Sequence, residues 1–73
     1  MSDLKFRKLL PDNKRLYKHS DGSFVVASVA ENMDHGFESM LFRADRDGNV
    51  LSWEALDVGF GVEPYDLADS YAG

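Results

Sequence analysis

The feature that most constrains the fold of this chain is a pair of Asp-Gly dipeptides, Asp21-Gly22 and Asp47-Gly48, each placed between apolar segments. Such a dipeptide is the strongest short-range signal for a β-hairpin, because a two-residue loop needs backbone conformations that Asn, Asp and Gly adopt most easily. Two hairpins in 73 residues predict a small antiparallel sheet joined by tight turns.

The first hairpin is predicted with Asp21-Gly22 as a two-residue loop. The register that follows sets three pairs opposite each other: His19 with Phe24, Tyr17 with Val26, and Leu16 with Ala27. Both faces of residues 23–30 are then apolar, as expected of a strand that is covered on both sides. We therefore predict that residues 23–30 form the central strand.

The second hairpin is predicted around Asp47-Gly48. Its register gives three apolar pairs on one face: Phe42 with Trp53, Ala44 with Leu51, and Met40 with Ala55. On the solvent face it brings Arg43 within reach of Glu54 for a charge pair. A helical turn capped by Ser52 is the alternative for residues 52–57, and the sequence leaves this choice open.

Three further elements are predicted around these hairpins. Residues Leu4 to Leu10 alternate between apolar and basic side chains, and we expect an edge strand whose lysines discourage pairing with other chains. The segment Glu31 to Gly36 is polar and ends in glycine, so it is predicted to be a loop. Gly59-Phe60-Gly61 is predicted to be a flexible bend.

The last residues follow a helical pattern. Pro64 suits the first position of a helix, and an apolar arc faces a polar one that contains Asp66 and Asp69. The members of the apolar arc are Tyr65, Leu67, Ala68, Tyr71 and Ala72. A helix of roughly nine residues is too short to exist alone, so it must pack on the sheet.

The sequence thus predicts a single α+β domain over residues 1–73. It consists of four or five antiparallel strands in a meander of hairpins, with one short C-terminal helix packed on them. An apolar content of 44% is enough for a folded core, and the absence of cysteine excludes disulfides and thiolate metal sites.

Charge is unevenly distributed along the chain. Residues 1–30 hold six bases against three acids, and residues 31–73 hold two bases against ten acids, so the net charges are +3 and −8 within a total of −5. A net acidic chain is a poor ligand for nucleic acid and for anionic membranes, so neither is an expected partner. Only the basic N-terminal part leaves such binding open.

The residues that carry catalysis or hold metals in other proteins do not form a convincing site. Asp45, Asp47 and Asn49 suit the first ligand positions of a calcium loop. However, Val50 and Leu56 stand where such a loop requires glycine and glutamate. His19 and His35 lack the convergent ligands of a zinc site. No serine has a glycine-flanked elbow, and no glycine-rich phosphate loop is present. We expect no enzyme activity, no cofactor and no metal.

The acidic C-terminal part is the better candidate for a site. Glu63, Asp66 and Asp69 are spaced by three residues, which places neighbouring carboxylates roughly 5–6 Å apart on one side of a helix. Glu54 and Asp57 extend the predicted patch to five carboxylates. Such a patch imitates nucleic-acid phosphates toward a groove of arginines and lysines. A solvated surface without a partner is the alternative, since a net charge of −5 is ordinary for a small soluble domain.

A resemblance to a known family begins with the segment from Phe37 to Phe42. It continues at later positions: Asp45, Gly48, Val50, Trp53 and Leu56-Asp57. This combination of a Glu-(Ser/Thr)-Met-x-Phe run, a glycine-centred turn and Trp-x-x-Leu-Asp resembles small uncharacterised proteins of actinobacterial phages. The resemblance implies a viral or mobile-element origin and expression in a bacterial host. Small phage proteins of this kind often bind a host or defence protein, and the resemblance implies no site residues.

Two functions follow as hypotheses. The first is a non-enzymatic interaction module in the bacterial cytoplasm that binds and inhibits a host or defence protein through its acidic C-terminal face. The second is a structural or assembly subunit, such as a virion component or a homodimer, that associates through an edge strand or an apolar patch.

Overall fold

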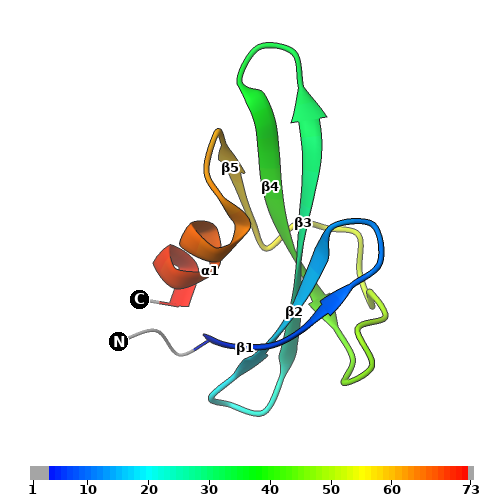
Figure 1. Cartoon of the computed structure of the whole chain (residues 1–73). Coiled ribbons are helices and arrows are strands. Elements are labelled where there is room, and N and C mark those ends of the chain that lie inside the picture. The colour runs from blue at the N-terminus through cyan, green and yellow to red at the C-terminus, as the bar shows by residue number, and fades with distance from the viewer. Residues whose placement is uncertain (1–3, 73) are drawn as a thin grey trace.

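The computed structural model describes residues 4–72, which form a five-stranded antiparallel sheet with one helix packed on it (Figure 1). The predicted α+β fold with a C-terminal helix is confirmed. In chain order the elements are β1 (Leu4–Leu10), β2 (Lys14–His19), β3 (Phe24–Asn32), β4 (Gly36–Ala44), β5 (Asp57–Phe60) and α1 (Pro64–Ala72).

Each strand pairs with the next one along the chain, in the order β1-β2-β3-β4-β5. The segment predicted as central is therefore the middle strand, β3, and Leu4–Leu10 is an edge strand as predicted. The β1–β2 turn has positive φ at Asp12 and Asn13, 62° and 60°. Aspartate and asparagine are the non-glycine residues that tolerate this conformation best, which explains why they form the turn after β1.

Both Asp-Gly turns have three-residue loops, and the predicted two-residue loops are wrong. In the first turn the Gly22 N–H donates to the His19 carbonyl at 3.0 Å, and the His19 N–H donates to the Ser23 carbonyl at 2.8 Å. In the second turn, Asp45 makes the two backbone hydrogen bonds that His19 makes in the first. Only the glycine of each dipeptide has positive φ, as in a type I turn that is followed by a left-handed residue.

The extra loop residue shifts the register of the first hairpin by one. Tyr17 lies opposite Val25 rather than Val26, and Leu16 lies opposite Val26 rather than Ala27. Because side chains alternate between faces, a shift of one residue moves each partner to the other face of the sheet. The predicted grouping of Tyr17 with Val26 is therefore wrong.

The predicted strand after the second turn is also wrong. Val50 forms an isolated bridge with Ala44, and the chain then leaves the sheet until Asp57 pairs with Leu41. Residues 51–56 form bends, so the alternative helical turn is absent from this stretch as well. Trp53 nevertheless contacts Phe42, with 5.3 Å between ring centroids.

One face of the sheet, here called the helix face, packs against α1. Its buried strand residues are Leu4, Tyr17, Val25, Ala27 and Leu41, and they form one cluster with Leu67 and Ala68 of α1. The Ser39 hydroxyl donates to the Val62 carbonyl and ties the segment before α1 to β4. Of the predicted apolar arc, Leu67 and Ala68 are buried, whereas Tyr65 and Tyr71 are 65% and 41% exposed.

Gly59 allows α1 to lie close to the sheet. A Cβ atom at this position would meet Val62 Cβ at 3.0 Å and Leu67 Cδ1 at 3.2 Å. Gly59 and Phe60 belong to strand β5. The prediction that Gly59-Phe60-Gly61 is a flexible bend is therefore wrong for its first two residues. Only Gly61, with φ of 69°, serves as the bend.

The opposite face, here called the open face, has a smaller core that no helix of residues 4–72 covers. Leu16, Val26 and Ala44 are buried there, and partly buried apolar residues at its margin pack over them. One of these is Leu10, whose Cδ1 lies 2.7 Å from the place of a Cβ atom at Gly48. The end of β1 therefore contacts the second Asp-Gly turn.

Candidate functional site

The unequal charge along the chain becomes a difference between the two faces of the sheet. Residues that lie opposite each other in an antiparallel pair share a face. Lys5 pairs with Lys18, Lys8 with Leu16, and Leu10 with Lys14, so these lysines belong to the open face. Arg15 and Arg43 pair with the buried helix-face residues Ala27 and Val25.

A bulge adds another cation to the open face. The β1–β2 register shifts between Phe6 and Lys8, and the extra residue is Arg7. A β-bulge re-aims the side chain that it inserts. Arg7 therefore lines the same depression as its neighbour Lys8.

That depression is here called the basic hollow. It has a volume of about 250 Å³ and is lined by Arg7, Lys8, Lys18 and Arg46, with Leu16 and Phe24 between them. No acidic residue is among the described residues that line it. No local pattern in the sequence predicts this site, because Arg7 enters it through a bulge and Arg46 comes from a distant turn.

The predicted acidic residues have different surroundings. Glu63, Asp66 and Asp69 are all exposed, just before α1 or on it. Asp57 is half-buried, and its Oδ1 accepts the Val58 N–H at 2.9 Å. Glu54 lies in the bends after the second turn, where it lines a depression together with Arg43.

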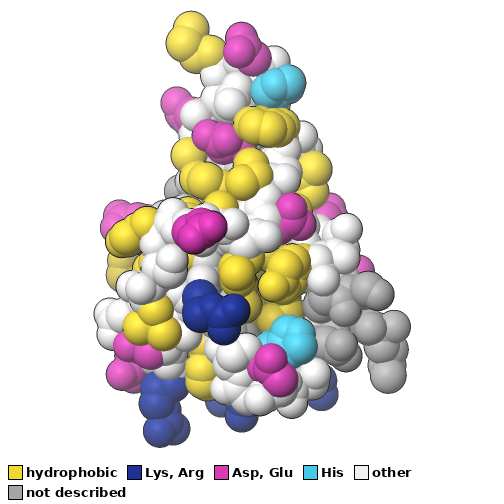
Figure 2. Space-filling model, turned by 180° about the vertical axis from the view of Figure 1, so that it is seen from behind, with side chains coloured by type: hydrophobic (Ala, Val, Ile, Leu, Met, Phe, Trp, Pro, Cys, Tyr) yellow, Lys and Arg dark blue, Asp and Glu magenta, His cyan; other side chains and the backbone are white. Residues whose placement is uncertain are grey.

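The predicted charge pair between Arg43 and Glu54 is not formed, since the ion pairs found within residues 4–72 do not include it. From behind, acidic side chains are spread over the molecule from top to bottom, whereas basic ones lie in its lower part (Figure 2). Of the five predicted carboxylates, Asp66 and Asp69 lie on α1 and Glu63 lies just before it, whereas Asp57 lies in β5 and Glu54 in the bends after the second turn.

One of the helix carboxylates borders a small depression between α1 and β1. This depression, here called the aromatic notch, has a volume of about 140 Å³ and is lined by Phe6, Tyr17, Tyr65 and Asp69, with Leu4 and Ala68 beside them. The rings of Phe6 and Tyr17 meet edge to face, 5.8 Å apart. Burial raises the pKa of Tyr17, an effect that nearby Arg15 opposes and Tyr65 reinforces.

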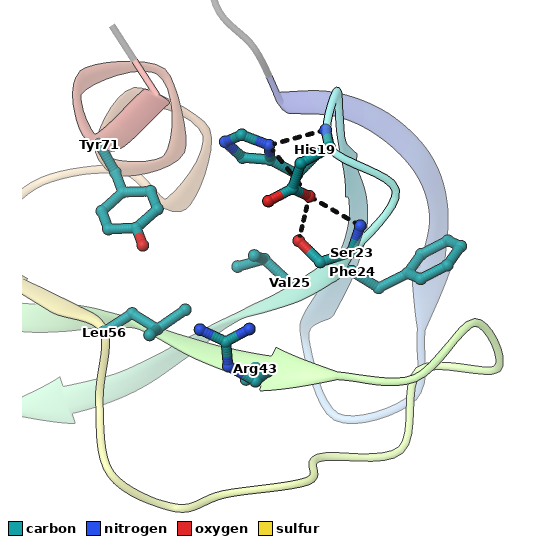
Figure 3. A pocket seen from close by; sticks show the side chains of 8 residues that line it. His19, Ser23, Phe24, Val25, Arg43, Leu56 and Tyr71 are labelled. Carbon is teal, nitrogen blue, oxygen red and sulfur yellow. Dashed lines mark hydrogen bonds and ion pairs between the residues drawn. The ribbon is translucent and has the colours of Figure 1, made fainter.

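His19 and Asp21 form the only close pair of imidazole and carboxylate found in residues 4–72, at 3.3 Å. The Asp21 Oδ1 accepts both the N–H and the hydroxyl of Ser23, at 2.8 and 2.6 Å, and these bonds lower the pKa of Asp21. The Asp21 N–H donates to His19 Nδ1 at 3.1 Å. These bonds build the turn at the rim of a depression that Tyr71 also lines (Figure 3).

This arrangement lacks the geometry of a catalytic site. The Ser23 hydroxyl donates to a carboxylate that is already engaged with backbone, and His19 Nδ1 accepts a backbone N–H. A nucleophilic serine would instead be hydrogen-bonded to a histidine that acts as its base. The group therefore stabilises the first hairpin turn.

Among residues 4–72, no group of three or more His, Asp or Glu side chains is placed to hold a metal ion. Within the same range, no helix is both long enough and apolar enough to cross a membrane. Comparisons of the chain with protein-family models, with curated proteins and with solved structures found no match.

Proposed function

We propose that this protein is a non-enzymatic interaction module that binds a basic protein surface through α1 and the aromatic notch. The observation that supports the proposal is the position of Asp69, which places a carboxylate at the margin of a depression lined by Phe6, Tyr17 and Tyr65. Aromatic faces and a carboxylate together suit one kind of group, a cationic side chain.

An arginine or lysine of the partner would be the central contact. Its alkyl stem would pack between Phe6 and Tyr65, and its charged end would meet Asp69. Exposed tyrosines are well suited to this role, because they bury a large area at a small cost in side-chain entropy. Glu63 and Asp66 would add longer-range attraction, which mainly raises the association rate.

A bacterial host or defence protein is the proposed partner, and binding would inhibit it. This part of the proposal rests on the resemblance of residues 37–57 to phage proteins. If the partner normally holds nucleic acid in an arginine- and lysine-lined groove, the carboxylates of α1 would occupy the places of phosphates. Competition between this protein and nucleic acid for the partner would then be expected.

The test is capture of partners from a bacterial lysate by the immobilised protein, at low and at high salt. The variant Asp66→Lys/Asp69→Lys should lose capture, and capture by the wild-type protein should fall steeply with salt. The matched control is Glu31→Lys/Asp34→Lys, which makes the same charge change at exposed sites of the β3–β4 hairpin. Equal capture by all three proteins would refute the proposal.

A second candidate function, assembly with other copies of the chain, is favoured by β5. In residues 4–72 this strand has a neighbour on one side only, and its side chains Val58 and Phe60 are 41% and 53% exposed. An exposed apolar edge strand is a template for pairing with another chain. Light scattering should then show an oligomer that persists at high salt and dissociates in Val58→Lys, whereas a monomer at every concentration would exclude this candidate.

A further inference from the structure

The basic hollow gathers four cations that have no carboxylate partner. No residue among Arg7, Lys8, Lys18 and Arg46 forms one of the ion pairs found in the described part of the chain. Lys18 also extends over the ring of Phe24, with 5.9 Å from its Nζ to the ring centroid. Like charges held close together repel one another, and an anion in the hollow would relieve that repulsion.

An exposed aromatic side chain lies on the same face. Trp53 is 70% exposed, although its ring contacts Phe42. The Lys14 Nζ lies 5.5 Å from the centroid of the indole ring. An accessible indole beside a cation is the arrangement on which proteins stack unpaired bases.

The hollow and Trp53 are close enough to contact one ligand. Leu16 of the hollow lies opposite Val26, and Val26 lies opposite Phe42. The ring of Phe42 contacts the ring of Trp53. Neighbouring strands are about 4.8 Å apart, so Leu16 and Phe42 are separated by roughly 10 Å. A few nucleotides of an extended strand span this distance.

We propose that the open face binds single-stranded nucleic acid, with backbone phosphates in the basic hollow and a base stacked on Trp53. A single strand is favoured over a duplex because stacking requires an unpaired base. The net charge of −5 does not oppose such binding strongly. At physiological ionic strength the screening length is about 8 Å, so the carboxylates of α1 on the helix face act weakly across the sheet.

The expectation that nucleic acid is not a partner follows from net charge alone, whereas the fold concentrates bases on one face of the sheet. The sequence contains six bases that the fold places on the open face or at its margin: Lys5, Arg7, Lys8, Lys14, Lys18 and Arg46. Local charge, rather than total charge, determines the potential that a strand of phosphates meets.

The experiment is a titration of the protein with an oligothymidylate of about 12 nucleotides, a length within the usual site size of one small domain. Trp53 is the only tryptophan, so its fluorescence reports directly on stacking. Binding should quench this fluorescence. With four phosphate contacts the logarithmic salt slope should be about −3, so a fourfold rise in salt should weaken binding roughly 50-fold.

Two exposed arginines provide a matched pair of variants. Arg46→Glu changes the charge within the hollow, and Arg43→Glu makes the same change on the helix face. We expect at least fivefold weaker binding for Arg46→Glu and less than a twofold change for Arg43→Glu. Trp53→Ala, followed by anisotropy of a labelled oligonucleotide, should weaken binding about tenfold. Circular dichroism confirms that each variant is folded.

Three results would overturn the proposal. Equal weakening by Arg46→Glu and Arg43→Glu would show that only net charge matters. A duplex of the same length bound as tightly as the single strand would exclude base stacking. Dextran sulfate that quenches Trp53 and binds as tightly as the oligonucleotide would show a general polyanion surface.

Discussion

The two faces of the sheet bury apolar residues in different ways. On the helix face, strand residues such as Leu41 are covered by a helix that is fixed through Gly59 and Ser39. On the open face, Leu16 and Val26 are covered by side chains from strands and turns, such as Leu10. The helix face thus has a two-layer core, whereas the open face has a smaller core with basic side chains at its margin.

The basic hollow and the larger, helix-face core therefore lie on opposite faces of the sheet. Side chains alternate between faces along each strand, so neighbouring residues of β2 serve different roles. Tyr17 belongs to the helix-face core, while Lys18 lines the basic hollow. Substitutions on the open face should therefore change binding at a smaller cost in stability.

The largest expected effect comes from removing a buried leucine on each face. Leu41→Ala should lower the free energy of unfolding by about 4 kcal/mol. The substitution leaves a cavity between the sheet and α1, and both of these layers are held in place. Leu16→Ala should lower it by only about 2 kcal/mol, because the marginal side chains can collapse into the space. Urea denaturation measures both values, and a larger loss for Leu16→Ala would contradict the comparison.

The next effect tests how closely α1 approaches the sheet. Gly59→Val should cost about 1–3 kcal/mol of stability, because its side chain would displace Val62 and Leu67. Val58→Ala, on the exposed side of the same strand, is the control and should cost less than about 1 kcal/mol. Similar costs for the two variants would show that α1 is not closely packed on β5.

A smaller effect distinguishes the two Asp-Gly turns. Gly22→Ala and Gly48→Ala both force alanine into positive φ, at 95° and 90°, which costs about 1–2 kcal/mol. A Cβ atom at Gly22 meets no other atom within 4 Å, whereas one at Gly48 clashes with Leu10. Thermal unfolding should show Gly48→Ala to be less stable than Gly22→Ala by up to about 1 kcal/mol, because Leu10 helps to close the open face.

The smallest effect concerns acid. Hydrogen bonds from the backbone and side chain of Asn49 lower the pKa of Asp45, so its ionised form stabilises the folded state at pH values above the unfolded pKa of about 3.9. This stabilisation is lost as the pH falls through the lower, folded pKa. In Asp45→Ala, urea midpoints should therefore vary less with pH below about 4 than in the wild-type protein.

Periodicity and turn residues were sufficient to predict most of the fold. The edge strand Leu4–Leu10, the central position of β3 and the helix starting at Pro64 were predicted because each depends on local pattern. The length of the two hairpin loops could not be predicted in this way. An Asp-Gly dipeptide locates the glycine with positive φ but not the number of loop residues before it. That number depended on the hydrogen bonds of His19 and Asp45.

The sites were predicted less completely than the fold. Glu63, Asp66 and Asp69 are exposed, as their spacing predicts, because the arrangement of residues on a helix and in the position just before it follows from sequence alone. The aromatic notch brings Phe6 together with Tyr65 from the other end of the chain. Such a contact depends on where α1 crosses the sheet, and no pattern within either segment specifies that position.

The consecutive order of the strands has a consequence for folding kinetics. Every strand pair joins neighbouring segments, so each hairpin can close at a small cost in loop entropy. Contacts between α1 and β1 join the most distant described parts of the chain and should form late. In native-state hydrogen exchange we therefore expect the amides of α1 to open before those of β3. A partner that binds between α1 and β1 would slow this opening.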